Sequence, residues 1–190
     1  MIEPEILLEG YRIGVFPMAM ADGSIEWFSP DPRAILPLDR FHVPHGLERI
    51  ARKREFEIRF DVSFREVMHA CAGRPETWIN QEIVESYTRL HEMGYAHSIE
   101  AWKEGELAGG LYGVSIGGAF FGESMFHRVR DASKVALLGL VEHLRARRFV
   151  LLDTQWTTPH LEQFGALEIP RAKYLHLLNT AVNLPRRFTD

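Results

Sequence analysis

Cysteine is almost absent from the 190-residue sequence, which contains only Cys71. A single cysteine cannot build an internal disulfide framework or a cysteine-rich zinc site, and it suits a reducing compartment. The apolar runs at 135–141 and 149–152 are much shorter than the roughly 18 residues that a membrane-spanning helix needs. The amino terminus, Met-Ile-Glu-Pro-Glu, lacks the basic and then apolar layout of a signal peptide. We therefore expect a cytosolic protein that does not contact a membrane.

Motifs for phosphate, dinucleotide and metal binding are also missing. The sequence has neither a Walker-type phosphate loop nor a Gly-x-Gly-x-x-Gly pattern, and its nine histidines form no His-Glu-x-x-His. His42 and His45 flank a proline, which is more typical of a surface segment than of a metal site. ATP, dinucleotide and metal chemistry are unsupported, so we expect neither a metal nor a cofactor.

The composition is that of one folded domain. Apolar residues make up 46% and charged residues 25%, which excludes disordered and low-complexity classes. The net charge of −4 argues against a partner held mainly by a strongly basic surface. Lys and Arg still cluster at 49–54, 145–148 and 171–173. Each cluster could contact phosphate, but for each cluster taken alone a solvated helix end is the favoured interpretation.

Hydrophobic periodicity and turn residues predict a mixed α+β fold with one central sheet. Helices are expected at 4–13, 44–54, 63–72, from 80 onward, 131–147, 159–164 and 171–178, with Ser63 and Asn80 as N-caps. Strands are expected at 26–28, 33–38, 57–60, 96–103, 106–116, 118–126, 149–152 and 167–169. The rest of 14–32 reads as loop, and the Gly117–Gly118 pair predicts a hairpin.

Two polar positions stand out against this pattern. Asp153 and Gln155 end an apolar strand, where alternate residues share a face, so both are expected to point the same way at the sheet edge. The other interpretation is a helix cap or a satisfied strand-end residue. Glu123 lies inside an almost wholly apolar strand and needs a cationic partner or solvent, unless one face of that strand is exposed.

Two aromatic residues also admit two interpretations. Trp78 precedes the helix that begins near Asn80, and it could stack on a nucleic acid base or act as a hydrophobic staple. Tyr87, two turns further on, could be a site residue, but its spacing is more typical of a core residue.

Eight motifs then occur in one order along nearly the whole chain. They are Gly14-Val-Phe-Pro-Met18, Trp27-Phe-Ser-Pro-Asp-Pro-Arg33, Thr77-Trp-Ile79, His97-Ser-Ile-Glu-Ala-Trp102, Gly122-Glu-Ser-Met-Phe126, Ala132-Ser-Lys134, Leu152-Asp-Thr-Gln155 and Gly165-Ala-Leu-Glu-Ile-Pro-Arg171. Together they resemble the bacterial leucyl/phenylalanyl-tRNA–protein transferases. The resemblance implies a GNAT-like acyltransferase fold with a central, mostly antiparallel sheet over residues 33–190, preceded by a reduced N-terminal segment, residues 1–32.

The resemblance also implies an activity. Leucine or phenylalanine would pass from aminoacyl-tRNA to the α-amino group of a protein that begins with Lys or Arg, creating a signal for proteolysis. No metal or organic cofactor is implied, and a monomer is expected. A hydrophobic pocket discriminates weakly between apolar side chains, so some transfer of methionine is expected as well.

Site residues follow by position from the same resemblance. The catalytic group would be Asp153, Gln155 and Glu123. The pocket for the aminoacyl side chain would be Leu111, Phe120, Leu137, Leu140 and Leu152. The terminal adenosine of tRNA would bind at Trp78, Met18 and Tyr87, with Met18 in place of a second stacking tryptophan found in some relatives.

Two other functions compete with this one. An acyl-CoA-dependent GNAT N-acetyltransferase would need a glycine-containing turn that cradles pyrophosphate, whereas residues 127–134 contain no glycine. A non-enzymatic RNA-binding module would not require the carboxylates at positions 123 and 153.

Overall fold

The computed structural model describes residues 1–74 and 77–190. The helices, in chain order, are α1 (Pro4–Arg12), η1 (Leu38–Arg40), α2 (His45–Lys53), α3 (Phe64–Ala72), α4 (Gln81–Glu92), α5 (Ala132–Ala146), α6 (Pro159–Glu162) and α7 (Arg171–Val182). The strands are β1 (Phe16–Ala19), β2 (Ile25–Phe28), β3 (Arg33–Ile35), β4 (Glu57–Phe60), β5 (Ala96–Lys103), β6 (Glu106–Ile116), β7 (Ala119–His127), β8 (Leu151–Gln155) and β9 (Leu167–Ile169).

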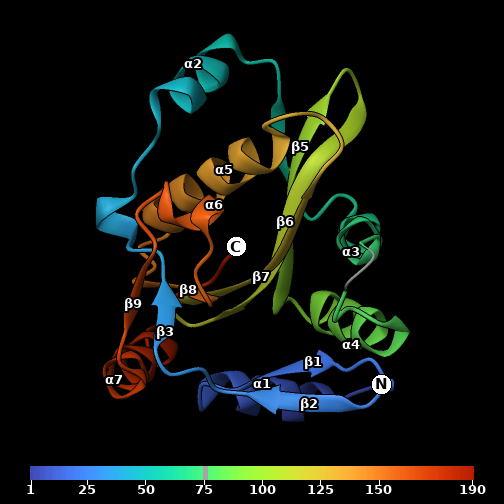
Figure 1. The fold of residues 1–190 in the computed structure, drawn as a ribbon, viewed down its shortest axis with the longest axis vertical. Helices are drawn as coiled ribbons and strands as arrows, with labels where there is room; N and C mark the ends of the chain where they lie inside the picture. The colour runs from blue at the N-terminus through green and yellow to red at the C-terminus, as the bar shows by residue number, and fades with distance from the viewer. Residues whose placement is uncertain (75–76) are drawn as a thin grey trace.

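A seven-stranded sheet forms the centre of the molecule, in the order β4-β5-β6-β7-β8-β3-β9 (Figure 1). Its neighbouring strands are antiparallel except for β7 and β8, which are parallel and are joined through α5. The expected mixed α+β architecture with a mostly antiparallel sheet is therefore confirmed. Within the described residues, no helix combines the length and the apolar character that crossing a bilayer requires.

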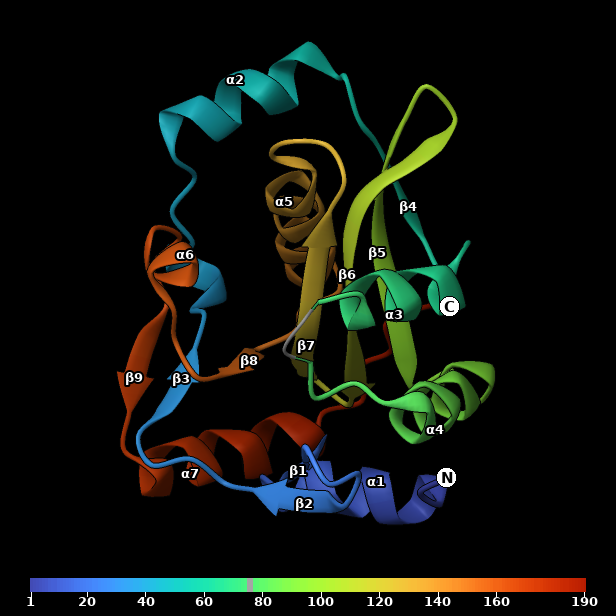
Figure 2. The same cartoon turned by 45° about the vertical axis from the view of Figure 1, so that its right-hand side comes forward.

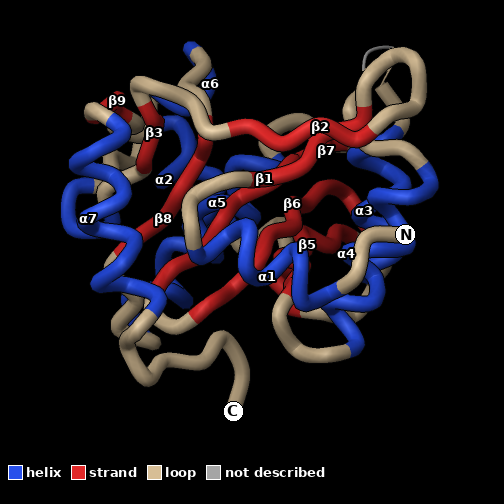
Figure 3. The backbone as a smooth tube through the Cα atoms, turned by 90° about the horizontal axis from the view of Figure 1, so that it is seen from below, coloured by secondary structure: helices blue, strands red, loops and turns tan. Residues whose placement is uncertain are grey.

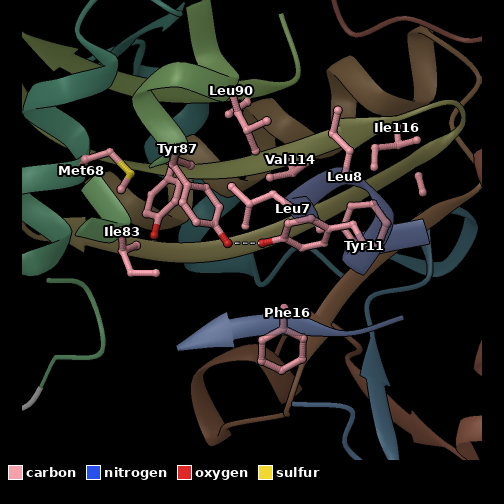
Figure 4. Packing of buried hydrophobic residues seen from close by; sticks show 14 of the residues in the cluster. Leu7, Leu8, Tyr11, Phe16, Met68, Ile83, Tyr87, Leu90, Val114 and Ile116 are labelled. Carbon is pink, nitrogen blue, oxygen red and sulfur yellow. Dashed lines mark hydrogen bonds between the residues drawn. The ribbon is translucent and has the colours of Figure 1, made fainter. Parts of the chain in front are cut away.

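Helices cover both faces of this sheet. Helix α5 lies on one face, while α3 and α4 lie on the other (Figure 1). The α5 side holds a buried cluster that includes Leu137, Leu140 and Leu144. The opposite cluster joins Leu7 and Tyr11 of α1 to residues of α4 and β6 (Figure 4). Burial of apolar surface on both faces fixes the sheet between these two layers.

The N-terminal segment, residues 1–32, packs against this sheet rather than standing apart. Strands β1 and β2 form a separate two-stranded sheet beside α1, close to α7 (Figures 2 and 3). Strand β1 was expected to be loop, but it pairs with β2 in a register that opposes Phe16 and Phe28. Phe16 belongs to the same buried cluster as Tyr87 of α4. The division at residue 32 stays a prediction, and the segment shares its core with the rest of the chain.

Most expected elements form, with shifted ends. The predicted strand at 149–152 is displaced to β8, because Val150 is 57% exposed and pairing with β7 starts only at Leu151. Asn80 caps α4 as expected, since its side chain accepts a hydrogen bond from the Ile83 N–H. Ser63 was expected to cap α3, but its side chain makes no capping hydrogen bond. Its N–H is instead bound to the buried carboxylate of Glu100.

The predicted hairpin between β6 and β7 turns at Gly117. Gly117 has a φ of +56°, and a Cβ atom there would lie 2.4 Å from the carbonyl oxygen of Val182. Glycine is required at this turn because a side chain would collide with the end of α7.

Candidate active site

The central sheet opens between its two parallel strands. The last pair between β7 and β8 joins Phe121 to Asp153. Beyond that pair lies a cavity of about 550 Å³, lined by residues 122–125 on one side and by residues 154–156 on the other. The separation of the strands therefore places side chains from the middle of the sheet on a cavity wall.

Most of the predicted site residues meet in this cavity. Those that line it are Met18, Trp78, Leu111, Glu123, Leu137, Leu140, Leu152 and Gln155. The four leucines come from β6, α5 and β8 and form an apolar patch on the cavity wall. Met18 and Trp78 lie close together, because the Ala19 N–H donates to the carbonyl oxygen of Trp78. The predicted residues thus give the cavity an apolar patch, an aromatic wall and the polar groups of Glu123 and Gln155, and the side chain of Arg74 lies in the same lining.

Asp153 lies behind the cavity instead of lining it. Its carboxylate is 0% exposed and pairs with the equally buried Arg33 through two hydrogen bonds, of 3.0 Å and 2.7 Å. The hydroxyl of Tyr174 and the main-chain N–H of Gln155 donate to the same carboxylate, each at 2.9 Å. The expectation that Asp153 and Gln155 share an open face does not hold, since all four contacts hold Asp153 inside the protein.

Arg33 is itself held on several sides. It donates to the carbonyl oxygen of Gly14, and its guanidinium lies over the rings of Phe16 and Tyr174 at 4.9 Å and 4.3 Å. A buried ion pair needs such additional partners to offset the loss of hydration. Arg33 is not among the predicted site residues, although a charged residue at the head of an apolar strand is the same signal that indicates Glu123.

Gln155 has a left-handed backbone, with a φ of +60°. This conformation costs a residue with a side chain on the order of 1–2 kcal/mol. The hydrogen bond from the Gln155 N–H to Asp153 holds the chain in this conformation, so Asp153 and Arg33 together position Gln155 through its main chain. The side-chain amide of Gln155 lies 3.5 Å from a carboxylate oxygen of Glu123.

Glu123 occupies an irregularity in β7. Tyr112 of β6 faces Ser124 and Gly113 faces Gly122, so Glu123 is an additional residue of β7 without a partner across the ladder. Its half-buried side chain accepts a hydrogen bond of 2.5 Å from the hydroxyl of Tyr11. No cationic side chain touches it within the described residues, because Arg33 is bound to Asp153. A bulge of this kind redirects one side chain toward a site.

Burial raises the pKa of Glu123 to about 8, and the nearby Asp153 carboxylate adds to the rise. The Tyr11 hydrogen bond and the Arg33 charge act in the opposite direction. Burial also raises the pKa of Tyr11 and Tyr87 well above 10, so both hydroxyls remain protonated. A carboxyl group with this pKa is mostly protonated at neutral pH, and a cation placed beside it would favour the charged form.

Residues 113–117 read Gly-Val-Ser-Ile-Gly and so match the Gly-x-Ser-x-Gly pattern of nucleophile elbows. That pattern has its chemical meaning only at a sharp turn between a strand and a helix. Ser115 lies instead inside β6, opposite Phe120, and is buried. Within residues 1–74 and 77–190, no group of three His, Cys, Asp or Glu residues is placed to hold a metal ion.

Comparison with known proteins gives the family. The family model described as "Leucyl/phenylalanyl-tRNA protein transferase" matches residues 35–179, and the model of its N-terminal domain matches residues 1–31. The chain belongs to the leucyl/phenylalanyl-tRNA–protein transferase family. It is therefore an aminoacyltransferase. Of the two enzymatic activities considered from the sequence, the family supports transfer from aminoacyl-tRNA over transfer from acyl-CoA.

Two relatives named leucyl/phenylalanyl-tRNA–protein transferase align over almost their whole length. The protein of Herpetosiphon aurantiacus is 58% identical over 188 residues, which is 98% of this chain and 98% of that relative. The protein of Akkermansia muciniphila is 57% identical over 186 residues, which is 95% of this chain and 96% of that relative.

Solved structures are more distant. A GCN5-related N-acetyltransferase-like protein from Streptococcus suis aligns with 87% of this chain and 63% of its own chain, at 13% identity and a TM-score of 0.41. The GNAT-like fold is the one that the family resemblance implies.

Besides Asp153, two residues that the transferase family implies for the site do not line the cavity. Tyr87 is fully buried, and its hydroxyl is hydrogen-bonded to that of Tyr11 (Figure 4). Tyr87 is therefore connected to Glu123 through Tyr11 and presents no surface to this cavity. Phe120 is fully buried as well, and it packs against Phe188 on the α5 side of the sheet.

Proposed function

We propose that this transferase moves leucine or phenylalanine from Leu-tRNA or Phe-tRNA to the α-amino group of proteins that begin with Lys or Arg, in the cytoplasm. The observation that supports this best is the juxtaposition of an apolar patch with Glu123 and Gln155 in one cavity. The patch suits a leucine or phenylalanine side chain, while the carboxyl group suits a cation. The product would be a protein marked for proteolysis by its new N-terminal residue.

The donor would bind along the apolar and aromatic walls. Leu111, Leu137, Leu140 and Leu152 would receive the aminoacyl side chain, and Trp78 with Met18 would take the terminal adenosine. A side chain without a branch at Cβ fits such a pocket best, and methionine differs from leucine by too little for complete rejection. Stacking and phosphate contacts would hold the tRNA end with strong salt dependence.

The reaction needs positioning more than a strong base. An α-amino group has a pKa of about 7.7–8.0, so a substantial fraction is neutral and nucleophilic at cellular pH. The amine nitrogen attacks the ester carbon, the bond to the ribose oxygen breaks, and the proton lost by the amine ends on that oxygen. Gln155 would accept a hydrogen bond from the amine. Holding the two reactants in attack geometry lowers the barrier by up to about 7–11 kcal/mol.

Asp153 would act through Gln155. Both of its oxygens already accept hydrogen bonds from Arg33, Tyr174 and Gln155, so it is fitted to position the Gln155 main chain. Those partners leave it unsuited to act as a base or to bind the acceptor. Glu123 would bind the acceptor's guanidinium or ammonium group and lose its proton as the cation arrives.

The test is transfer of labelled leucine from Leu-tRNA to a peptide that begins with Arg, with an Ala-led peptide and acetyl-CoA as controls. We expect transfer to the Arg-led peptide alone and only from aminoacyl-tRNA. Gln155→Ala should lower kcat by about 100-fold, in the range of one hydrogen-bonding or acid–base group. Transfer from acetyl-CoA, or equal transfer to both peptides, would contradict the proposal.

Glu123→Gln tests the acceptor assignment separately. The variant should raise the KM for the Arg-led peptide at least tenfold, because a charge-assisted contact is lost, and leave the KM for Leu-tRNA nearly unchanged. Equal increases for both substrates would remove Glu123 from acceptor recognition.

A further inference from the structure

Trp156 presents a large aromatic surface at the mouth of the cavity. Its side chain is 45% exposed, follows Gln155 directly and lines the same cavity. The ring is held edge-to-face by Phe16 and Phe28, with centroids 5.2 Å and 6.2 Å away. Contacts from these two rings fix the indole while leaving part of its surface open.

The backbone of Gln155 accounts for this placement. Successive residues of a regular strand point to opposite faces, so Gln155 and Trp156 would not both reach one cavity. The left-handed conformation of Gln155 breaks the alternation, and Thr154, Gln155 and Trp156 all line the cavity. Strain of this kind clusters at functional sites, and Gln155 is the residue with a side chain and a positive φ that lines this cavity. The chain therefore uses the same turn to present Gln155 and Trp156 together.

Trp156 and Trp78 approach the cavity from different ends of β1. The ring of Trp156 lies against Phe16 at the start of β1, whereas the main chain of Trp78 is bound to Ala19 at its end. The two ends are about 10 Å apart at the rise of a β-strand. The two tryptophans therefore reach the cavity from different points along β1, and Trp156 is the one that directly follows Gln155.

Charge indicates the kind of group that the Trp156 indole suits. Gln155, the neighbour of Trp156, lies 3.5 Å from Glu123, whose carboxyl has no cationic partner among the described residues. An indole face attracts Arg and Lys side chains more strongly than any other aromatic ring does, and a guanidinium also stacks on it. A ring that shares a cavity with an unpartnered carboxyl group is suited to a cation.

We propose that Trp156 binds the acceptor, with its indole face against the Arg or Lys side chain whose charge reaches Glu123. This inference rests on the proposed function. It makes Trp156 a residue that determines specificity for the acceptor rather than for the aminoacyl-tRNA.

The experiment compares Trp156→Leu with Trp27→Leu, a change at another partly exposed tryptophan that does not line the cavity. Steady-state transfer is measured with Arg-led peptide and Leu-tRNA varied in turn. Trp156→Leu should raise the KM for the peptide by about 2- to 30-fold, the range of a cation–π contact, and keep the KM for Leu-tRNA within twofold. The Trp27 variant should keep both values near those of the wild type.

A citrulline-led peptide adds a second readout, because citrulline keeps the shape of Arg and lacks its charge. The preference for Arg over citrulline in kcat/KM should fall in Trp156→Leu. Trp156→Phe keeps an aromatic ring on Phe16 and Phe28, and it should show a smaller change in the same direction. It serves as the test if the leucine variant does not fold.

Three results would decide against Trp156. A rise in the KM for Leu-tRNA that equals or exceeds the rise for the peptide would place Trp156 on the donor. Unchanged values for both substrates, or an unchanged Arg-to-citrulline preference, would remove it from recognition. Failure of the wild type to transfer leucine to any Arg-led peptide is a different result, which contradicts the proposed function itself.

Discussion

Glu123 shows how one residue can be costly to the fold and useful to the site. Its carboxyl group is half-buried on a bulge and receives one strong hydrogen bond, from Tyr11. Burial makes the charged form unfavourable and raises the pKa to about 8, against about 4.5 for a free glutamate. A proton on this group stabilises the fold, and an incoming cation can take the place of that proton.

Glu123 should therefore make stability depend on pH. Between about 4.5 and 8 the folded protein keeps a proton that the unfolded chain loses, so this residue's contribution falls as pH rises. Glu123→Gln cannot ionise, and its free energy of unfolding relative to the wild type should increase from pH 5 to pH 8. Urea unfolding of both proteins at each pH measures the difference.

Tyr11→Phe supplies a matched comparison. The Tyr11 hydrogen bond lowers the pKa of Glu123, so its removal should raise that pKa further. The fall in the free energy of unfolding with rising pH should then extend to higher pH than in the wild type. A constant difference between Glu123→Gln and the wild type over the whole range would contradict the assignment.

At the scale of single elements, the two predicted helix caps behave differently. The side chain of Asn80 accepts the Ile83 N–H at 2.9 Å, whereas the side chain of Ser63 caps nothing. Asn80→Ala should therefore lower the free energy of unfolding by about 1 kcal/mol, and Ser63→Ala should change it much less. Thermal melting of the two variants beside the wild type measures this. Equal losses would mean that the Asn80 hydrogen bond contributes nothing of its own.

Strand boundaries explain why some elements could be predicted and others could not. Periodicity located β5, β6 and β7, because long strands with turn glycines carry their own signal. Strand β1 has only four residues, one of them Pro17, and its pairing with β2 defines it. The length of β8 likewise depends on where β7 begins, and the local sequence does not contain that information.

At the scale of the whole molecule, the C-terminal tail closes the core. Phe188 is 2% exposed, stacks on His97 with centroids 4.2 Å apart, and lies tilted against His143 with centroids 4.4 Å apart. The His143 ring is also hydrogen-bonded to the Phe188 carbonyl oxygen. Nothing in the local pattern of 183–190 distinguishes this phenylalanine from an exposed one.

Phe188→Ala should lower the free energy of unfolding by about 3–5 kcal/mol, because a buried aromatic side chain is lost and a cavity remains. Thr189→Ala is the control, since Thr189 is exposed. Chemical unfolding of the two variants gives the values. A Phe188 variant as stable as the Thr189 variant would show that the tail does not anchor the fold.

The sequence by itself determined the family and the mixed α+β class, because ordered motifs and periodicity are local properties of the chain. The family resemblance then indicated eight residues that line the cavity. Only the tertiary structure decided that Asp153 is bound to Arg33, 120 residues away, and that Tyr87 and Phe120 lie outside the cavity. It also brought Tyr11 of the N-terminal segment to Glu123. Burial and ion pairing depend on which distant segments meet, and a local pattern shows that a charge needs a partner but not which residue supplies it.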